Sequence, residues 1–312
     1  MKKVTWLVVC VLLMVSCNKE EKMDEAAVKM QEFVIHISNY SKGIDPDFII
    51  IPQNGVELAY NSTDPNLGVN ESYMGVIDGL GVEELFFNED PLESDGRLEM
   101  LQALKTRAKV MVADYVSTDD QWSTSVTLCR NEGFISFPRA ASNYDYKEIP
   151  SVIPDANDDS VTTLSQARNY LYLINTDNFT TKESMLEAIR GTRYDLIILD
   201  PYFNEEPLSF SEISSLKTKS TGGSRLVIAY VNIGSAENWR YYWQDDWKLH
   251  KPDWLAKKYE GYDDEIWVEF WNQEWQDIIY GNEASYMKKV LDAGFDGAYL
   301  DNVEAYYFLY GK

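Results

Sequence analysis

The sequence contains little cysteine, histidine or basic side chain. It has three cysteines and two histidines among 312 residues. Cys10 and Cys17 lie in an N-terminal segment with the features of an export signal, so Cys129 is alone in the folded part. An intramolecular disulfide is therefore excluded, and the core must be stable without one. The same scarcity argues against a zinc site, and we predict neither a metal nor a cofactor.

Basic residues are also few relative to acidic ones. The 28 Lys and Arg against 51 Asp and Glu give a formal net charge of -23. Nucleic-acid binding requires Lys and Arg to neutralise phosphates, so this class of partner is disfavoured. Anionic polysaccharides are disfavoured by the same repulsion, whereas neutral or cationic glycans are compatible with the charge. Solubility alone could also explain it. The 9 Trp and 21 Tyr suit a large core, and exposed ones could stack on sugar rings.

The first residues have the pattern of a bacterial export signal. Lys2 and Lys3 precede an apolar run, 4–15, that is too short to span a membrane comfortably. The segment Leu13-Met14-Val15-Ser16-Cys17 resembles the lipobox of bacterial lipoproteins. This resemblance implies a signal peptide over 1–16, a lipid on Cys17 and a tether over 17–26. It also implies an outer-membrane lipoprotein, surface-exposed or facing the periplasm, with the membrane as a partner through its lipid anchor.

Apolar runs that end in polar residues recur through the rest of the chain. We predict strands near residues 50, 85, 112, 172, 198, 229, 268 and 299, mostly separated by segments with the spacing of helices. Continuous apolar runs suit strands that are buried on both faces, as in parallel sheets. Eight such units over 27–312 predict one α/β domain, a (β/α)8 TIM barrel, although the periodicity is also compatible with an open doubly wound sheet.

Polar residues at the ends of these strands are the candidate site residues, because a (β/α)8 barrel gathers the carboxyl ends of its strands at one mouth. Asp301, which ends the strand 297–301 after the helix stop at Gly294, is the first of them. A turn-capping role for Asp301 is the alternative. The candidate carboxylates are Asp114, Asp200, Glu237, Glu269, Asp301 and Glu304. The candidate sugar-binding amides and aromatics are Gln53, Asn54, Tyr115, Tyr202, Tyr230, Asn232, Trp239, Trp271, Tyr299 and Asn302.

Two of these candidates have a competing structural interpretation. Glu237 could pair with Arg240 instead of contacting substrate. Trp239 belongs to a dense aromatic segment that could be either a platform for sugars or barrel packing. Its members are Trp239, Tyr241, Tyr242, Trp243 and Trp247. The sequence leaves both alternatives open.

Several segments together resemble glycoside hydrolase family 114, the endo-α-1,4-polygalactosaminidases, and their wider bacterial and archaeal relatives. They are 194–201, 227–237, 267–269 and 294–304, and the specific similarity covers mainly 168–304. Segments 48–58, 77–87 and 110–115 resemble the later strands of the wider relatives. The resemblance implies a circularly permuted barrel, in which the strand near 172 corresponds to the family's first and the strand near 50 to its sixth.

The resemblance also implies the reacting groups. Glycosidic bond cleavage generally uses two carboxyl groups. One family acid lies in a Trp-Leu-Asp segment, which corresponds to Glu269 here. The other lies in Gly-Val-Glu-Pro-Asp-Asn, whose glutamate is Tyr299 and whose aspartate is Asp301. We therefore predict Glu269 and Asp301 as the catalytic pair, assisted by Asp200.

These assignments predict a surface-anchored glycosidase with a carbohydrate partner, either a neutral or an amino-sugar polysaccharide. Since Tyr299 replaces the family glutamate, the alternative is a catalytically silent glycan-binding lipoprotein on the same barrel.

Overall fold

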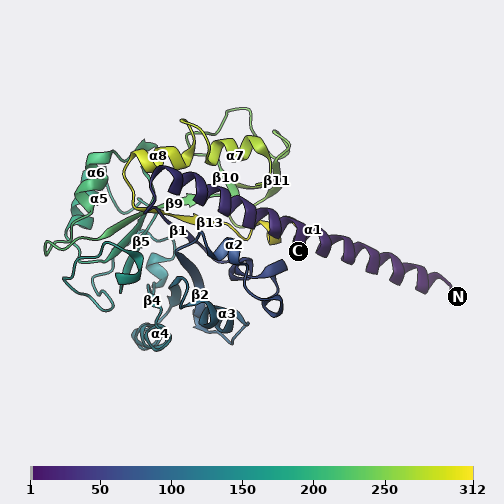
Figure 1. Ribbon diagram of the computed structural model, residues 1–312, viewed down its shortest axis with the longest axis horizontal. Coiled ribbons are helices and arrows are strands. Elements are labelled where there is room, and N and C mark those ends of the chain that lie inside the picture. Colours follow the sequence, from purple (N-terminus) through teal and green to yellow (C-terminus); the bar gives the residue numbers. More distant parts are fainter. Residues whose placement is uncertain (1–2, 312) are drawn as a thin grey trace.

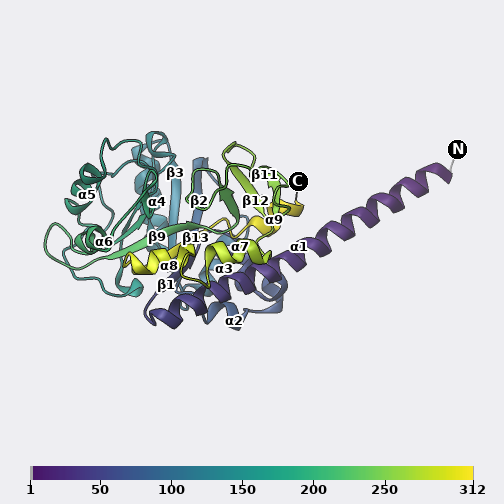
Figure 2. The ribbon, with the colours of Figure 1, turned by 90° about the horizontal axis from the view of Figure 1, so that it is seen from above.

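The computed structural model describes residues 3–311, with side chains from Lys19 onward. The predicted signal peptide, 1–16, and the lipidation site, Cys17, fall outside the residues whose side chains are described. Helix α1 (Lys3–Ile44) includes the predicted tether, and its N-terminal end extends away from the body of the molecule (Figure 1). Further along, α1 buries Phe33 and Ile37 and runs beside α8 (Tyr286–Asp292) (Figure 2). No helix of the described part of the chain is long and apolar enough to cross a membrane.

The core is built from parallel strands in two sheets. A five-stranded sheet has the order β1-β13-β9-β6-β5, and a three-stranded sheet has the order β2-β3-β4. The strands of the first are β1 (Ile49–Pro52), β5 (Tyr170–Leu173), β6 (Leu196–Leu199), β9 (Leu226–Asn232) and β13 (Gly297–Asp301). Those of the second are β2 (Gly79–Pro91), β3 (Lys109–Val116) and β4 (Ile135–Ser136). All pairs within both sheets are parallel, which confirms the α/β class.

The two sheets meet at β1 and β2. A parallel bridge pairs Gln53 with Gly81, and the amide of Asn54 donates to the carbonyl of Gly81 at 2.7 Å. On the other side no ladder joins β4 to β5 within residues 3–311. The amides of Ile174 and Asn175 instead donate to the carbonyl of Tyr146, at 3.1 and 3.3 Å. The segment after β4 is thereby fixed to the end of β5.

Helices lie in most of the segments between the parallel strands, as the spacing of apolar residues there predicts. The longer ones after α1 are α3 (Arg97–Leu104), α4 (Asp119–Glu132), α5 (Lys182–Arg190) and α8. Thr181 caps α5 by accepting the amide of Ser184. The shorter helices are α2 (Glu71–Met74), α6 (Phe210–Leu216), α7 (Gln273–Ile279) and α9 (Ala305–Tyr310). Short 3₁₀ turns cover Val56–Ala59, Asn61–Thr63, Pro65–Leu67, Ala141–Asn143 and Leu164–Gln166.

The strand predicted near residue 268 exists, but its place in the parallel core is wrong. β12 (Glu265–Val268) runs antiparallel between β10 (Ser235–Glu237) and β11 (Leu255–Lys258) in a separate sheet. A two-stranded hairpin of β7 (Tyr202–Phe203) and β8 (Glu206–Pro207) also lies outside the core. The eighth parallel strand is β4, which has only two residues. An apolar run indicates that a strand is buried but gives neither its direction nor its partner. The longer apolar run at 266–271 therefore predicted a core strand more strongly than the short segment of β4 did.

Aromatic side chains fill the interior between the two sheets. Tyr172 on β5 stacks on Tyr146 with ring centroids 3.9 Å apart, and meets Tyr299 of β13 edge-on at 5.3 Å. Gly81 on β2 makes room for this cluster, since a Cβ there would lie 2.0 Å from the hydroxyl oxygen of Tyr299. Rings from the first sheet and from the segment after β4 therefore pack together beneath the ends of the strands.

Candidate active site

A cavity of about 730 Å³ opens at the carboxyl ends of the parallel strands. Its floor comprises residues that directly follow β1, β6 and β13, and one side is formed by β10 and β12. It is lined by ten of the sequence-predicted residues: Gln53, Asn54, Asp200, Tyr202, Tyr230, Glu237, Trp239, Asp301, Asn302 and Glu304. Most of the residues that were predicted from their positions at the ends of strands therefore line one cavity.

The cavity is strongly acidic. Its lining contains ten carboxylates, namely Glu83, Glu84, Asp145, Asp177, Asp200, Glu237, Asp264, Glu265, Asp301 and Glu304. Only Arg139 and Arg240 are basic in this lining, so the formal charge of the wall is 2 − 10, or −8. Such a wall repels anions and favours neutral or cationic molecules.

Asp301 lies at the carboxyl end of β13 and is partly buried. The hydroxyl of Tyr230, on the neighbouring strand β9, donates to Oδ2 of Asp301. Burial, with a smaller contribution from the charges of Glu83 and Glu237, raises the pKa of Asp301 to about 7 against the opposing effect of the Tyr230 hydrogen bond. Asp301 can therefore hold a proton near neutral pH.

Glu265, at the start of β12, is a candidate that the sequence analysis missed. Its Oε2 accepts from the Ser235 hydroxyl at 2.6 Å and from Nδ2 of Asn232 at 3.2 Å. Burial raises its pKa to about 8, and the charges of Glu237 and Asp301 act in the same direction. An antiparallel strand brings its first residue, not its last, to this rim. Glu265 directly precedes the apolar residues 266–268, and this polar residue at the start of the strand could have been identified had the direction of β12 been known.

Arg240 binds two of the predicted carboxylates at one side of the cavity. It is only 6% exposed, and its guanidinium donates to both oxygens of Asp200 at 2.8 and 2.7 Å. The same group donates to Glu237 at 2.6 and 3.2 Å, which confirms the ion-pair alternative for this residue. Burial raises the pKa of Glu237, although Arg240 acts in the opposite direction. Asp200 and Glu237 are thus held in a buried charge cluster.

The cavity lining also contains carboxylates that the sequence did not single out, among them Glu83 and Glu84. The hydroxyl of Tyr146 donates to Glu83, whose own amide donates to Oδ1 of Asn54 at 3.0 Å. Arg139 donates to Glu84 at 3.2 Å. Burial raises the pKa of Glu304 to about 7. Glu83 and Glu84 lie within β2, where a register shift between residues 83 and 88 interrupts the pairing with β3.

Glu269, the predicted partner of Asp301, does not line the cavity. It follows β12 at the end opposite Glu265, roughly 13 Å further along an extended chain. Its amide donates to the carbonyl of Trp254 at 2.9 Å. Trp271 lies outside the cavity as well, with the ammonium of Lys29 4.5 Å from its ring centroid. The structure therefore does not bring Glu269 and Asp301 into one cavity.

Four other predicted residues lie beneath or beside the cavity without lining it. Asp114 is fully buried and accepts from the amide of Phe86 at 2.9 Å and from the Ser125 hydroxyl at 2.6 Å, so it stabilises the irregular part of β2. Tyr299 lies two residues before Asp301 on β13 and is buried in the aromatic interior. The others are Tyr115, which packs edge-on against Tyr144 at 5.3 Å, and Asn232, which orients Glu265.

The aromatic segment 239–247 divides between the two interpretations. Trp239 and Tyr241 are each 41% exposed. Tyr242 is buried against Trp275 and Trp247 packs on Trp254, with ring centroids 5.6 and 5.0 Å apart.

Among the residues with described side chains, no group of three or more His, Cys, Asp or Glu could hold a metal ion.

Comparison with known proteins finds a family match in the second half of the chain. Residues 162–310 match the model of the glycoside-hydrolase family GH114. An uncharacterized protein of Thermotoga maritima is 30% identical over 119 residues, which are 38% of this chain and 35% of the relative. One from Methanocaldococcus jannaschii is 30% identical over 152 residues, 48% of this chain and 41% of the relative. One from Deinococcus radiodurans is 30% identical over 125 residues, 40% of this chain and 38% of the relative. The matches thus span well under half of each relative.

Proposed function

We propose, from the match of residues 162–310 to the model of glycoside hydrolase family GH114, that the chain is a glycosidase whose reacting carboxyl groups are Asp301 and Glu265. The observation that carries the proposal is the pair of partly buried carboxyl groups in one cavity, with pKa values raised to about 7 and about 8. Two carboxyl groups, one protonated and one ionised, are the usual requirement for cleaving a glycosidic bond.

Each carboxyl group is held through one oxygen. Tyr230 binds Oδ2 of Asp301, while Ser235 and Asn232 bind Oε2 of Glu265. This leaves Oδ1 and Oε1 for the substrate. Because the charge of Asp301 raises the pKa of Glu265, the two titrations are linked, and near pH 7 to 8 the pair holds roughly one proton. In the singly protonated state one group donates to the leaving oxygen and the other stabilises the positive charge that develops on the sugar.

The fold that supports this chemistry is proposed to be a circularly permuted (β/α)8 barrel. The family match contains β5, β6, β9 and β13, while β1 to β4 precede it in the chain. β1 pairs with β13, so the N-terminal strands continue the order of the matched ones. The contacts of Tyr146 with Ile174 and with Tyr172 support closure between β4 and β5.

The substrate is proposed to be a neutral or amino-sugar polysaccharide. The −8 formal charge of the cavity lining favours a glycan with free amino groups over one with carboxylate or sulfate groups. Attachment to the outer membrane through a lipid on Cys17 is proposed from the lipobox-like segment. Replacement of Cys17 by serine should abolish labelling by a fatty-acid analogue in cells.

The experiment is reducing-end release from α-1,4-linked polygalactosamine. Asp301→Asn and Glu265→Gln should each lower the rate about 100-fold or more, with binding of the polymer largely retained. Glu269→Gln is the matched control, because Glu269 lies outside the cavity. Full activity in both cavity variants, or loss only in Glu269→Gln, would refute the assignment of Asp301 and Glu265.

A glycan-binding protein without turnover is the second candidate. The observation that favours it is Tyr299, which replaces the family glutamate with a buried side chain that does not reach the cavity. Binding of the polymer by the native chain, with no release of reducing ends under any buffer condition, would establish this alternative.

A further inference from the structure

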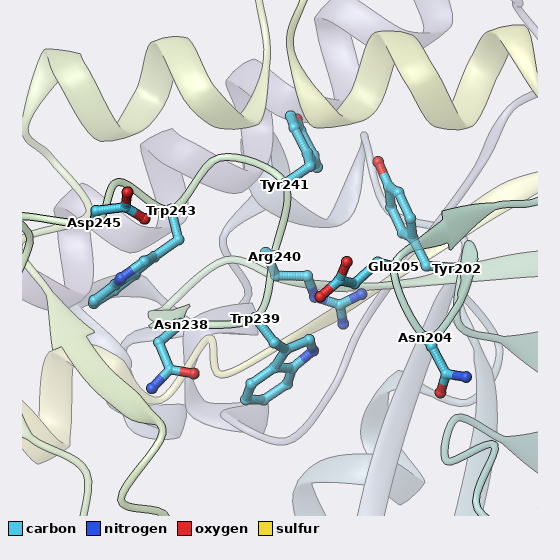
Figure 3. A pocket seen from close by; sticks show the side chains of 9 residues that line it. All are labelled: Tyr202, Asn204, Glu205, Asn238, Trp239, Arg240, Tyr241, Trp243 and Asp245. Carbon is cyan, nitrogen blue, oxygen red and sulfur yellow. The ribbon is translucent and has the colours of Figure 1, made fainter.

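A second, smaller pocket of about 400 Å³ adjoins the cavity. Tyr202, Asn204, Trp239 and Arg240 line both, so the two spaces are continuous. The remaining lining residues of the smaller pocket are Glu205, Asn238, Tyr241, Trp243 and Asp245 (Figure 3). None of these five lines the larger cavity.

The two exposed aromatic rings of this pocket are held in fixed orientations. The guanidinium of Arg240 lies 5.8 Å from the ring centroid of Trp239, and Arg240 is itself fixed by Asp200. Tyr241 stacks on Tyr202 at 5.9 Å with an interplanar angle of 21°. Trp239 nevertheless remains 41% exposed, although the next residue is almost fully buried. An oriented indole with one open face is suited to stacking on the apolar face of a sugar ring.

The polar groups of the pocket suit sugar hydroxyls and amino groups. Asn204 lies in the turn between β7 and β8 with a φ of 55°, a left-handed conformation that asparagine tolerates, and Figure 3 places Asn204 and Asn238 on opposite sides of Trp239. Their amides can donate to and accept from hydroxyls. Glu205 and Asp245 supply negative charge, and the positive charge of Arg240 is balanced by Asp200 and Glu237.

We propose that this pocket is a sugar-binding subsite that extends the main cavity and binds a further neutral or cationic sugar ring of the same chain. The proposal rests on the glycosidase or glycan-binding function proposed above. The subsite adds affinity for longer oligosaccharides, because these can occupy the main cavity and the adjoining pocket at the same time. Its lining does not favour uronic acids or sulfated sugars, because the one basic residue in that lining, Arg240, is paired with Asp200 and Glu237.

The test measures binding to the Asp301→Asn variant by calorimetry, so that cleavage does not interfere. The probes are α-1,4-linked galactosamine oligomers of two and six sugars and the fully N-acetylated hexamer. The hexamers should bind more tightly than the dimer. Adding Trp239→Ala should weaken hexamer binding roughly three- to tenfold and remove most of this length dependence. Trp239→Phe should restore most of it.

Further variants separate charge from stacking. Glu205→Gln should weaken binding of the galactosamine hexamer and reduce its salt dependence, while the neutral N-acetylated hexamer should be unaffected. Phe210→Ala is the aromatic control, since Phe210 is 65% exposed on α6 and lines neither space. It should bind all probes as the parent does.

The outcomes also distinguish failure of the subsite proposal from failure of the glycosidase proposal. Hexamer affinity that is unchanged in Trp239→Ala, or no binding of any probe, overturns the subsite. If the native chain cleaves polymer while Trp239→Ala keeps the native KM for the hexamer, the subsite fails and the glycosidase stands. If binding depends on Trp239 but the native chain never cleaves, the subsite stands and the glycosidase fails.

Discussion

Replacing Arg240 with methionine should strongly destabilise the fold. The guanidinium makes four hydrogen bonds of 2.6 to 3.2 Å to Asp200 and Glu237, and all three side chains are largely buried. Removing it leaves two buried carboxylates without a counter-charge. Breaking a buried ion pair in this way costs about 3 to 5 kcal/mol. Methionine has a similar length and leaves a smaller cavity than alanine would, so the loss of stability comes mainly from the missing positive charge.

The loss should depend on pH in a defined direction. Burial already raises the pKa of Glu237 in the folded protein, and removing Arg240 should raise it further. A carboxyl group whose folded pKa is raised gives stability that is present below its unfolded pKa, about 4.3, and lost as the pH rises through the folded pKa. The deficit of Arg240→Met should therefore be smallest near pH 4.5 and grow toward pH 8.

Urea unfolding at several pH values measures this difference. Lys288→Met is the matched control, because Lys288 pairs at 2.7 Å with Asp292 on the surface of α8. It should change the free energy of unfolding by at most about 1 kcal/mol at any pH. Substituting Asp200→Asn and Glu237→Gln together with Arg240→Met should recover much of the loss. A deficit for Arg240→Met that matches the control, or that does not change with pH, would refute the assignment of a buried charge cluster.

Three further changes follow from contacts of single residues. Asp301→Asn should stabilise the protein at pH 8 and have little effect near pH 4, because the raised pKa of about 7 means that ionised Asp301 is disfavoured in the folded state. Urea titrations at both pH values measure this difference, and a variant that is only as stable as the native protein at pH 8 would contradict it. Tyr230→Phe should move the acidic limb of the pH–rate profile to higher pH, since the Tyr230 hydrogen bond lowers the pKa of Asp301, the member of the pair with the lower pKa. A limb that is unmoved or moves to lower pH would count against Asp301 as a reacting group. Gly81→Ala should destabilise by about 1 to 3 kcal/mol or more through its clash with Tyr299, whereas Gly43→Ala, which meets no atom within 4 Å in α1, should be neutral or slightly stabilising in thermal unfolding.

Part of the candidate site could be predicted from the polar residues at the ends of the strands. Asp301, Asn302, Gln53 and Asn54 follow long apolar runs, and parallel strands bring such positions to one rim whatever the loops do. Glu265 escaped this rule because β12 is antiparallel and presents its first residue to the cavity. The direction of a strand depends on partners that are distant in the chain, so it cannot be predicted from local periodicity.

The sequence by itself determined the α/β class, seven of the eight parallel strands and the acidic character of the molecule, because these depend on local apolar spacing and on composition. Only the tertiary structure decided which carboxylates share a cavity. It placed Glu269 outside it, fixed Glu237 on Arg240, and buried Tyr299 and Asp114 below it. The physical reason is that pairing, burial and pKa depend on neighbours brought together across the fold, and those neighbours are not adjacent in the chain.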